Sequence, residues 1–357
     1  MKTAILIIAD DLTGAADSAV AFAERGFETE VSIEGLRGGD GDAEVVAFAT
    51  ETRDVHVDEL PGRFDVLRSA GTERLLLFKK IDSMLRGNTI AEIELATQIL
   101  PEHMVIISPA YPKLGRVCID GQVHWNDRAG AGAINLAESL RRCGMRPNSL
   151  PGAVDAGSLA DALRGDREHG RVFLHDATND EDLESVARAG RGVDRAVLWV
   201  GSGGLAHALA KQFPKRPNTI GHFEPRAGTA LLFVGSDHPV TEAQLEMLHE
   251  EDLTDVFVIR IRRGDDAAAN EIRAAVRRVE PRKISLIFMT GGDTAMQVCR
   301  ALGVASLKIE SEYAPGVPAG RVKKGLADGV PVVLKSGGFG DADLLCRICH
   351  EVRAHHA

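Results

Sequence analysis

The chain has 357 residues, which is longer than a typical domain built on a single hydrophobic core, so two domains are expected. Its hydrophobic content of 44% and charged content of 26% are those of an ordinary globular protein, and few aromatics (4%) with 37 glycines fit an α/β enzyme better than a β-sandwich or a coiled coil. The net charge of −10 at pH 7 argues against non-specific nucleic-acid binding, but it does not exclude an anionic small molecule held by a local cluster of cations.

Through the first half of the chain, short apolar runs alternate with segments whose apolar residues recur at helical spacing, such as Leu12–Arg25 and Ala91–Leu100. This order of strands and helices predicts an α/β fold with a mostly parallel, doubly wound sheet covered by helices on both faces. The expected strands are Ala4–Ala9, Val31–Ile33, Glu44–Ala49, Arg74–Phe78, Met104–Ser108, Arg171–His175 and Ala196–Val200.

The first apolar run, Ala4–Ala9, is too short for the apolar region of a signal peptide and no cleavage site follows it, so we expect a buried strand. No stretch approaches the roughly 18 apolar residues of a membrane span. The five cysteines, an odd number scattered along the chain, are typical of reduced thiols. We therefore expect a cytoplasmic protein without a membrane or nucleic-acid partner.

The first predicted strand ends in Asp10 and Asp11, where a dinucleotide-binding fold would show G-x-G-x-x-G. Two carboxylates would repel a phosphate unless a metal ion lay between them, so we expect them to bind substrate hydroxyls or to hold a metal or another cation. The alternative is helix capping, which accounts for one of the two. Arg53 follows a second strand at the same sheet edge, where it can bind a carboxylate in bidentate fashion or form a surface ion pair.

The segment Lys79–Asn88 places many polar side chains directly after a buried strand, at the sheet edge where open α/β sheets bind ligands. Lys80, Arg86 and Asn88 suit an anionic molecule rich in hydroxyls, and Asp82 can take a proton from one of those hydroxyls. In the alternative interpretation the segment is a polar loop before a helix, with Thr89 and Glu92 forming a capping box.

Two prolines and clustered charges make residues 214–227 a predicted linker, after which the strand–helix alternation restarts in a second, smaller α/β domain, 228–357. Its expected strands are Thr229–Val234, Val256–Ile259, Ile284–Met289, Leu307–Ile309 and Pro331–Leu334. Its expected helices are one from about Thr241, Asp265–Val279, Thr294–Leu302 and one from Asp341.

Three glycine-bearing loops follow three strands of this second domain and precede probable helices: Gly235–His238, Thr290–Thr294 and Lys335–Asp341. Glycine lets backbone amides close around phosphate oxygens, and a helix N-terminus adds a favourable dipole. Together the loops predict a nucleotide site, although no P-loop motif G-x-x-x-x-G-K-[ST] occurs in the chain.

Six stretches, in this order, closely resemble those of the four-carbon acid sugar kinases: Ala9–Ala15, Lys79–Asn88, Ser108–Arg116, Gly201–Leu205, Thr290–Thr294 and Lys335–Gly340. The resemblance covers nearly the whole chain and implies an acid-sugar-binding domain, 1–213, followed by the linker and a nucleotide-binding domain, 228–357. It also implies that the protein uses ATP and Mg²⁺ to phosphorylate the terminal hydroxyl of a tetronate, such as threonate, erythronate or a 3-oxo-tetronate.

Carried over by resemblance, the sugar-acid site comprises Asp10, Asp11, Arg53, Lys80, Asp82, Ser83, Arg86 and Asn88. The nucleotide contacts comprise Ser236, Thr290, Gly291, Gly292, Asp293, Gly337 and Gly338. The catalytic base is Asp82 or Asp11, and the residues that bind metal are not identified. The sequence departs from the family pattern at Met84, where threonine is usual, at Asp237–His238, which replaces two small residues, and at Asp293, where glutamate is common.

Two other functions remain open at this point. One is an oxidoreductase or aldolase acting on the same acid sugars, which the missing glycine fingerprint disfavours. The other is a sugar-acid-binding protein without catalysis, which Asp237 and His238 beside the expected phosphate loop keep in consideration. A homodimer is expected only because most oligomers of soluble proteins are symmetric dimers.

Overall fold

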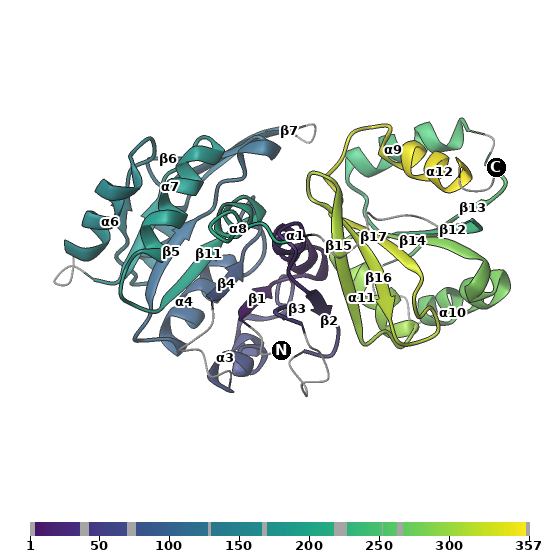
Figure 1. Cartoon of the computed structure of the whole chain (residues 1–357), viewed down its shortest axis with the longest axis horizontal. Helices are drawn as coiled ribbons and strands as arrows, with labels where there is room; N and C mark the ends of the chain where they lie inside the picture. Colours follow the sequence, from purple (N-terminus) through teal and green to yellow (C-terminus); the bar gives the residue numbers. More distant parts are fainter. Residues whose placement is uncertain are drawn as a thin grey trace.

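The computed structural model describes residues 4–35, 43–69, 76–127, 130–165, 170–217, 227–251, 253–262 and 267–354. These residues form two lobes side by side along the longest axis of the molecule, joined by one continuous sheet of 14 strands (Figure 1). A second sheet has three strands. The predicted linker, 214–227, lies mostly outside the described residues.

The N-terminal lobe contains eight strands that pair in parallel, which confirms the predicted sheet. Strand β4 extends two residues further than its sequence suggests, so both Lys79 and Lys80 lie within the strand. The strands, in their order across the sheet, are β2 (Thr29–Ser32), β3 (Val45–Ala49), β1 (Ile5–Ala9), β4 (Leu76–Lys80), β11 (Val197–Gly201), β5 (Met104–Ser108), β10 (Val172–His175) and β9 (Asn148–Leu150).

The C-terminal lobe contributes four parallel strands and an antiparallel hairpin that completes the sheet. The hairpin strand β15 pairs antiparallel with β2, so one sheet crosses from lobe to lobe. The sequence pattern predicted only the first part of β15 and missed its partner β16. The strands, in order, are β13 (Val256–Arg260), β12 (Thr229–Val234), β14 (Ile284–Thr290), β17 (Pro331–Lys335), β16 (Val317–Lys323) and β15 (Ser306–Ala314).

The small antiparallel sheet was also missed by the sequence pattern, and it consists of β6 (Arg116–Ile119), β7 (Gln122–Asp127) and β8 (Gly130–Asn135). Asp120 and Gly121 form the turn between its first two strands, and both have positive φ angles (50° and 71°), as a two-residue hairpin turn requires.

Helix α1 (Leu12–Ala23) lies between the lobes, packing on β1, β3 and α8 on one side and on β15, β16 and α11 on the other (Figure 1). All twelve of its residues are buried, and its many alanines allow close approach on every side. The other helices are α2 (Leu60–Arg63), α3 (Asp65–Ser69), α4 (Thr89–Ile99), α5 (Leu136–Arg142), α6 (Ala156–Gly165), α7 (Asp180–Arg191), α8 (Gly203–Ala210), α9 (Pro239–His249), α10 (Ala268–Val279), α11 (Gly292–Ala301) and α12 (Leu344–Ala354). Among the helices described, none has the length and apolar character to span a membrane.

Candidate active site

A cleft of about 860 Å³ lies where the carboxyl ends of strands from both lobes face each other. The N-terminal lobe contributes charged side chains to it, and the C-terminal lobe contributes the three glycine loops. Its lining residues include Asp11, Thr13, Arg53, Asp54, Arg86, Ser236, Asp237, His238, Arg260, Arg262, Gly291, Gly292, Asp293, Gln297, Ser336, Gly337 and Gly338. A smaller pocket, here called the inner pocket, adjoins the cleft and is lined by Lys80, Asp82, Ser83, Met84, Arg116 and Phe339 in addition to residues of the cleft.

Arg53 joins three aspartates that come from two different strand ends. Its guanidinium lies 2.7 Å from Asp10 Oδ2, 2.7 Å from Asp11 Oδ2 and 3.5 Å from Asp82 Oδ2. All three carboxylates are buried, so without this cation they would repel one another in a medium of low dielectric constant. Arg53 is therefore paired with carboxylates of the protein itself, and its contact with a substrate carboxylate stays a prediction.

Asp82 is held in place by several donors. Arg86 binds it through two nitrogens, Nε to Oδ1 at 3.0 Å and Nη2 to Oδ2 at 2.5 Å, and the Met84 amide donates to Oδ1 at 2.9 Å. Burial alone would raise the pKa of Asp82, but Arg86, Arg53 and Lys80 lower it far below its ordinary value. Asp82 is thus a permanent anion that orients Arg86 at the edge of the cleft.

Asp11 is the N-cap of α1, accepting a hydrogen bond from the Gly14 amide at 2.6 Å. Asp11 also lies against the start of α11 in the other lobe. The approach is so close that a Cβ added at Gly292 would lie 2.5 Å from Asp11 Oδ2. Burial raises the pKa of Asp11, Arg53 opposes that effect and the neighbouring Asp10 adds to it, so the net pKa is above the ordinary value. The pKa of Asp10 is instead lowered, because Arg53, Lys79 and Lys80 together outweigh its burial.

The remaining residues of Lys79–Asn88 have different surroundings. Lys80 and Ser83 line the inner pocket. The Asn88 amide donates to the carbonyls of Thr52 and Val55 at 2.8 Å each, so its amide nitrogen braces the loop that carries Arg53.

The proposed capping box is wrong. Asn88 precedes α4 without a side-chain cap, and Thr89 Oγ1 donates to the Arg86 carbonyl at 2.8 Å. Glu92 is instead fully buried and pairs with Lys79 Nζ at 2.7 Å, because Lys79 points away from Lys80 to the other face of the sheet.

In the C-terminal lobe, the glycine loops approach one another so closely that side chains are excluded. A Cβ at Gly235 would overlap Thr294 Oγ1, and one at Gly337 would overlap Ser236 Oγ. Gly291 precedes α11 with φ of 96°, a conformation that favours glycine. Among the predicted nucleotide residues, Ser236, Gly291, Gly292, Asp293, Gly337 and Gly338 line the cleft, whereas Thr290 is buried inside β14 and does not.

Several residues of the site were not predicted from the sequence. Thr13 Oγ1 lies 3.0 Å from Ser336 Oγ, a hydrogen bond between the lobes. Lys335 is fully buried and donates to the Gly337 carbonyl at 2.8 Å, which fixes the third glycine loop, and its burial lowers its pKa to about 7. Both Thr13 and Ser336 lie in stretches that the sequence singled out, but nothing in the sequence indicated that the two stretches meet.

His238, whose presence beside the phosphate loop was unexpected, is the N-cap of α9: its Nδ1 accepts the Val240 amide at 3.2 Å. Two arginines at the carboxyl end of β13, Arg260 and Arg262, also line the cleft. Arg260 pairs with Glu242, and Arg262 lies one residue beyond Ile261 at the same strand end.

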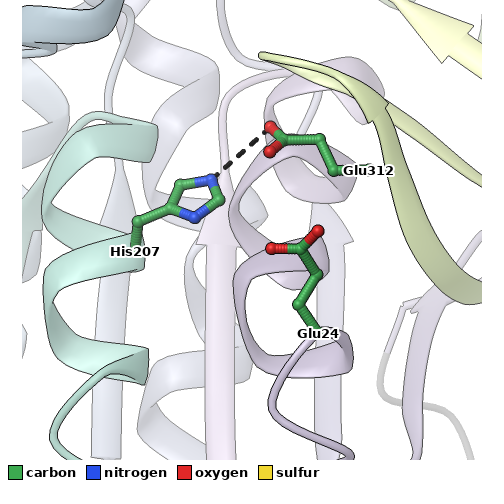
Figure 2. Close-up of side chains that lie close together, drawn as sticks. All are labelled: Glu24, His207 and Glu312. Atoms are coloured by element: carbon green, nitrogen blue, oxygen red, sulfur yellow. Dashed lines mark ion pairs between the residues drawn. The ribbon is translucent and has the colours of Figure 1, made fainter. Parts of the chain in front are cut away.

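A second polar cluster lies outside the cleft, where α1, α8 and β15 meet (Figure 2). Potential metal-binding atoms of Glu24, His207 and Glu312 lie within 4.8 Å of one another. His207 Nε2 lies 3.6 Å from Glu312, which also accepts the Gly316 amide at 2.8 Å. Burial lowers the pKa of His207, but the hydrogen bond and charge of Glu312 together raise it by more, so the net pKa lies above the ordinary value. We therefore interpret the cluster as an ion pair, between His207 and Glu312, that joins the two lobes.

Comparisons with known proteins agree with this division into lobes. A family model described as a sugar-binding N-terminal domain matches residues 5–146 and 130–209, and one described as a nucleotide-binding C-terminal domain matches residues 274–345. The chain is 31% identical to the D-threonate kinase of Cupriavidus necator, with 94% of each chain covered. It is 25% identical to the D-erythronate kinase of Heliobacterium modesticaldum and 26% identical to the 3-oxo-tetronate kinase of Methylobacterium radiotolerans, with at least 95% of each chain covered.

Solved structures show the same fold. A Haemophilus influenzae protein aligns with a TM-score of 0.71 over 99% of this chain and 100% of its own, at 19% identity. A Bordetella bronchiseptica protein, a domain-swapped dimer with bound citrate, aligns with a TM-score of 0.51 at 28% identity over 99% of each chain. With two matched domains, a related kinase above 30% identity and a cleft that joins a charged pocket to glycine loops, this chain belongs to the four-carbon acid sugar kinase family.

Proposed function

We propose that this sugar acid kinase transfers the terminal phosphoryl group of ATP to the terminal hydroxyl of a four-carbon acid, a tetronate or 3-oxo-tetronate. The observation that carries the proposal is the composition of the two walls of the cleft. One wall presents the buried carboxylate of Asp11 with Arg53 and Arg86, and the other presents three glycine loops, two of which lead directly into helices α9 and α11. The relatives named as kinases of threonate, erythronate and 3-oxo-tetronate support the substrate class.

In this proposal the acid sugar binds in residues 1–213, with its carboxylate at the inner pocket, a space of about 20 Å³, and the rest of the molecule in the adjoining cleft, and ATP binds in residues 228–357. Gly292, Gly337 and Gly338 line the cleft without side chains, so phosphate oxygens can approach the backbone there. The N-terminus of α11 adds a favourable dipole for the same charge. Arg262 at the outer end of the cleft adds a cation on the nucleotide side.

The cleft also fits a magnesium ion. Carboxylates of Asp54, Asp237 and Asp293 line it, and carboxylate oxygens together with phosphate oxygens are the ligands that Mg²⁺ prefers. When bound, the ion would neutralise charge on the phosphates of ATP. The departures from the family pattern at Asp237 and Asp293 are thereby compatible with nucleotide binding.

Of the two candidate bases, the surroundings favour Asp11. A base must be able to accept a proton in the transition state, and the donors on Asp82 hold its pKa far too low for that role. Asp11 has a raised pKa and lies against the N-terminus of α11, where we place the transferred phosphoryl group. We infer that Asp11 takes the proton of the attacking hydroxyl, while Asp82 positions Arg86 to bind the acid.

The test is a coupled ADP-release assay with Mg-ATP against tetronates, 3-oxo-tetronates and pentonates, with phosphate position read by NMR. We expect ADP release with one four-carbon acid and phosphorylation at its terminal hydroxyl. ATP binding without turnover of any acid would point to an acid outside the panel. Absence of both turnover and ATP binding would refute the proposal and favour a non-catalytic sugar-acid-binding protein. We further infer a homodimer, which sedimentation equilibrium can test.

A further inference from the structure

The inner pocket is not built by the N-terminal lobe alone. Lys80, Asp82 and Arg116 come from that lobe, but Ser336 and Phe339, which also line the pocket, come from the loop after β17. That loop carries Gly337 and Gly338 of the nucleotide side. One loop of the C-terminal lobe therefore contacts both halves of the site.

Phe339 reaches from this loop into the N-terminal lobe. Its ring lies 5.2 Å from the Arg116 guanidinium, in cation–π geometry, and 6.5 Å from the Tyr111 ring, edge to face. On the opposite side the ring packs so tightly on Gly316 that a Cβ there would overlap it. The ring is thus held between the β15–β16 hairpin of its own lobe and two side chains of the other lobe.

The backbone of Phe339 is fixed to the rest of the loop. Its amide donates to the Ser336 carbonyl at 3.1 Å, and its carbonyl accepts from Gln244 Nε2 at 3.2 Å. Ser336 in turn contacts Thr13 across the cleft at 3.0 Å. A displacement of the loop by nucleotide phosphates would therefore be transmitted to the ring of Phe339.

Arg116 is the partner that this ring touches in the inner pocket. It is buried, with 3% exposure, and its Nη2 lies 3.9 Å from Met84 Sδ. A buried guanidinium at the wall of a pocket for an acid is suited to bind a carboxylate, and its orientation decides whether both oxygens are reached. Met84, the departure from the family pattern, and Phe339 together fix that orientation.

We propose that Phe339 positions Arg116 to bind the carboxylate of the acid sugar, so that nucleotide binding at Ser336–Gly338 and acid binding at Arg116 strengthen each other. The inference rests on the proposed function, because it takes the acid to occupy the inner pocket. Since coupling between two binding sites is reciprocal, each ligand should tighten the other by the same factor.

Calorimetry tests the proposal. The acid that the ADP-release assay identifies is titrated into the protein, once alone and once in the presence of a non-hydrolysable Mg-ATP analogue. For the wild type we expect the analogue to tighten acid binding. For Phe339→Ala we expect acid binding to weaken by about 3- to 30-fold, from the usual strength of a cation–π contact, and the coupling factor to approach one. Phe339→Leu keeps an apolar side chain in the same place but should lose the coupling, which separates the effect of the ring from a packing defect.

Phe257→Ala removes an exposed phenylalanine from β13 and is the matched control, expected to bind both ligands as the wild type does. Arg116→Lys keeps the charge but not the planar fork, and we expect its KM for the acid to rise more than its KM for ATP, which should rise only by the lost coupling factor. Wild-type coupling in both Phe339 variants would overturn the inference while leaving the kinase function intact. A wild type that phosphorylates no acid would instead refute the proposed function, and the inference would fall with it.

Discussion

Replacing Asp11 and Asp82 by asparagine in separate variants distinguishes the base from the positioning residue. Asparagine is nearly the same size as aspartate and is an equally good N-cap, so Asp11→Asn should keep the start of α1 that Asp11 now caps through the Gly14 amide. The variant loses only the negative charge and the ability to accept a proton. We therefore expect a folded enzyme with kcat lowered by about 10²- to 10⁴-fold, the usual contribution of a general base.

Asp82→Asn should act on substrate binding instead. The carboxylate accepts two hydrogen bonds from the Arg86 guanidinium, one from the Arg86 amide and one from the Met84 amide, and asparagine cannot accept the bidentate pair. A hydrogen bond to a charged group contributes about 1.5–3 kcal/mol, which corresponds to about 10- to 100-fold in affinity. We expect KM for the acid to rise by that factor, with a smaller change in kcat.

The assay is ADP release under saturating Mg-ATP as a function of acid concentration and pH. A base works only when deprotonated, so activity should fall as the pH falls through the raised pKa of Asp11, and that acidic limb should lie above the ordinary range of an aspartate. Asp11→Asn should abolish the limb along with the activity. A variant Asp11→Asn with wild-type kcat, or an Asp82→Asn variant that loses kcat at unchanged KM, would refute the assignment.

Two further substitutions test the structure around the site. Lys79→Met leaves Glu92 charged and buried without its partner, so the free energy of unfolding measured in urea should fall by about 3–5 kcal/mol. The double variant Lys79→Met, Glu92→Leu should recover most of that loss. Equal stability of the single and double variants would contradict a buried ion pair. Gly235→Ala forces a methyl group against Thr294 Oγ1, and the usual cost of such overpacking is about 1–3 kcal/mol. We expect KM for ATP to rise while KM for the acid stays constant. Gly62→Ala is the control, because an added Cβ at Gly62 would have no atom within 4 Å.

The sequence predicted where the site lies better than what each residue does there. Alternation along β4 shows why: Lys79 and Lys80 are adjacent and chemically identical, yet one is buried against α4 and the other lines the inner pocket. The sequence placed both at a strand end but could not say which face each occupies. Asn88 is likewise predicted to bind substrate, which stays a prediction, and the structure adds that its amide nitrogen braces the neighbouring loop.

What the sequence could not supply was contact between distant segments. The pairing of β15 with β2 and the hydrogen bond between Thr13 and Ser336 join residues more than 270 positions apart, and no local pattern of apolar residues encodes such a pairing. Most parallel strands were predicted because they are apolar runs, whereas the short parallel strand β9 (Asn148–Leu150), with Asn148 and Ser149, was missed. The strands of the β6–β8 sheet were not, because β8 consists mainly of exposed and partly buried glycines and alanines, and β6 and β7 mix polar residues with the buried Cys118 and Val123.

Both ends of α1 touch the C-terminal lobe, and this determines how the reacting groups are held. At its start Asp11 lies against Gly292 at the N-terminus of α11, and at its end Glu24 accepts a hydrogen bond from the backbone of Glu312 beside His207. The helix between them is buried along its whole length and contacts elements of both lobes. The distance from the proposed base to the proposed phosphate site is therefore set by the packing of a rigid helix. Because that distance is fixed in this way, the loops after β12 and β17 are the parts of the cleft that remain to adjust to ATP, and the second of these carries Phe339.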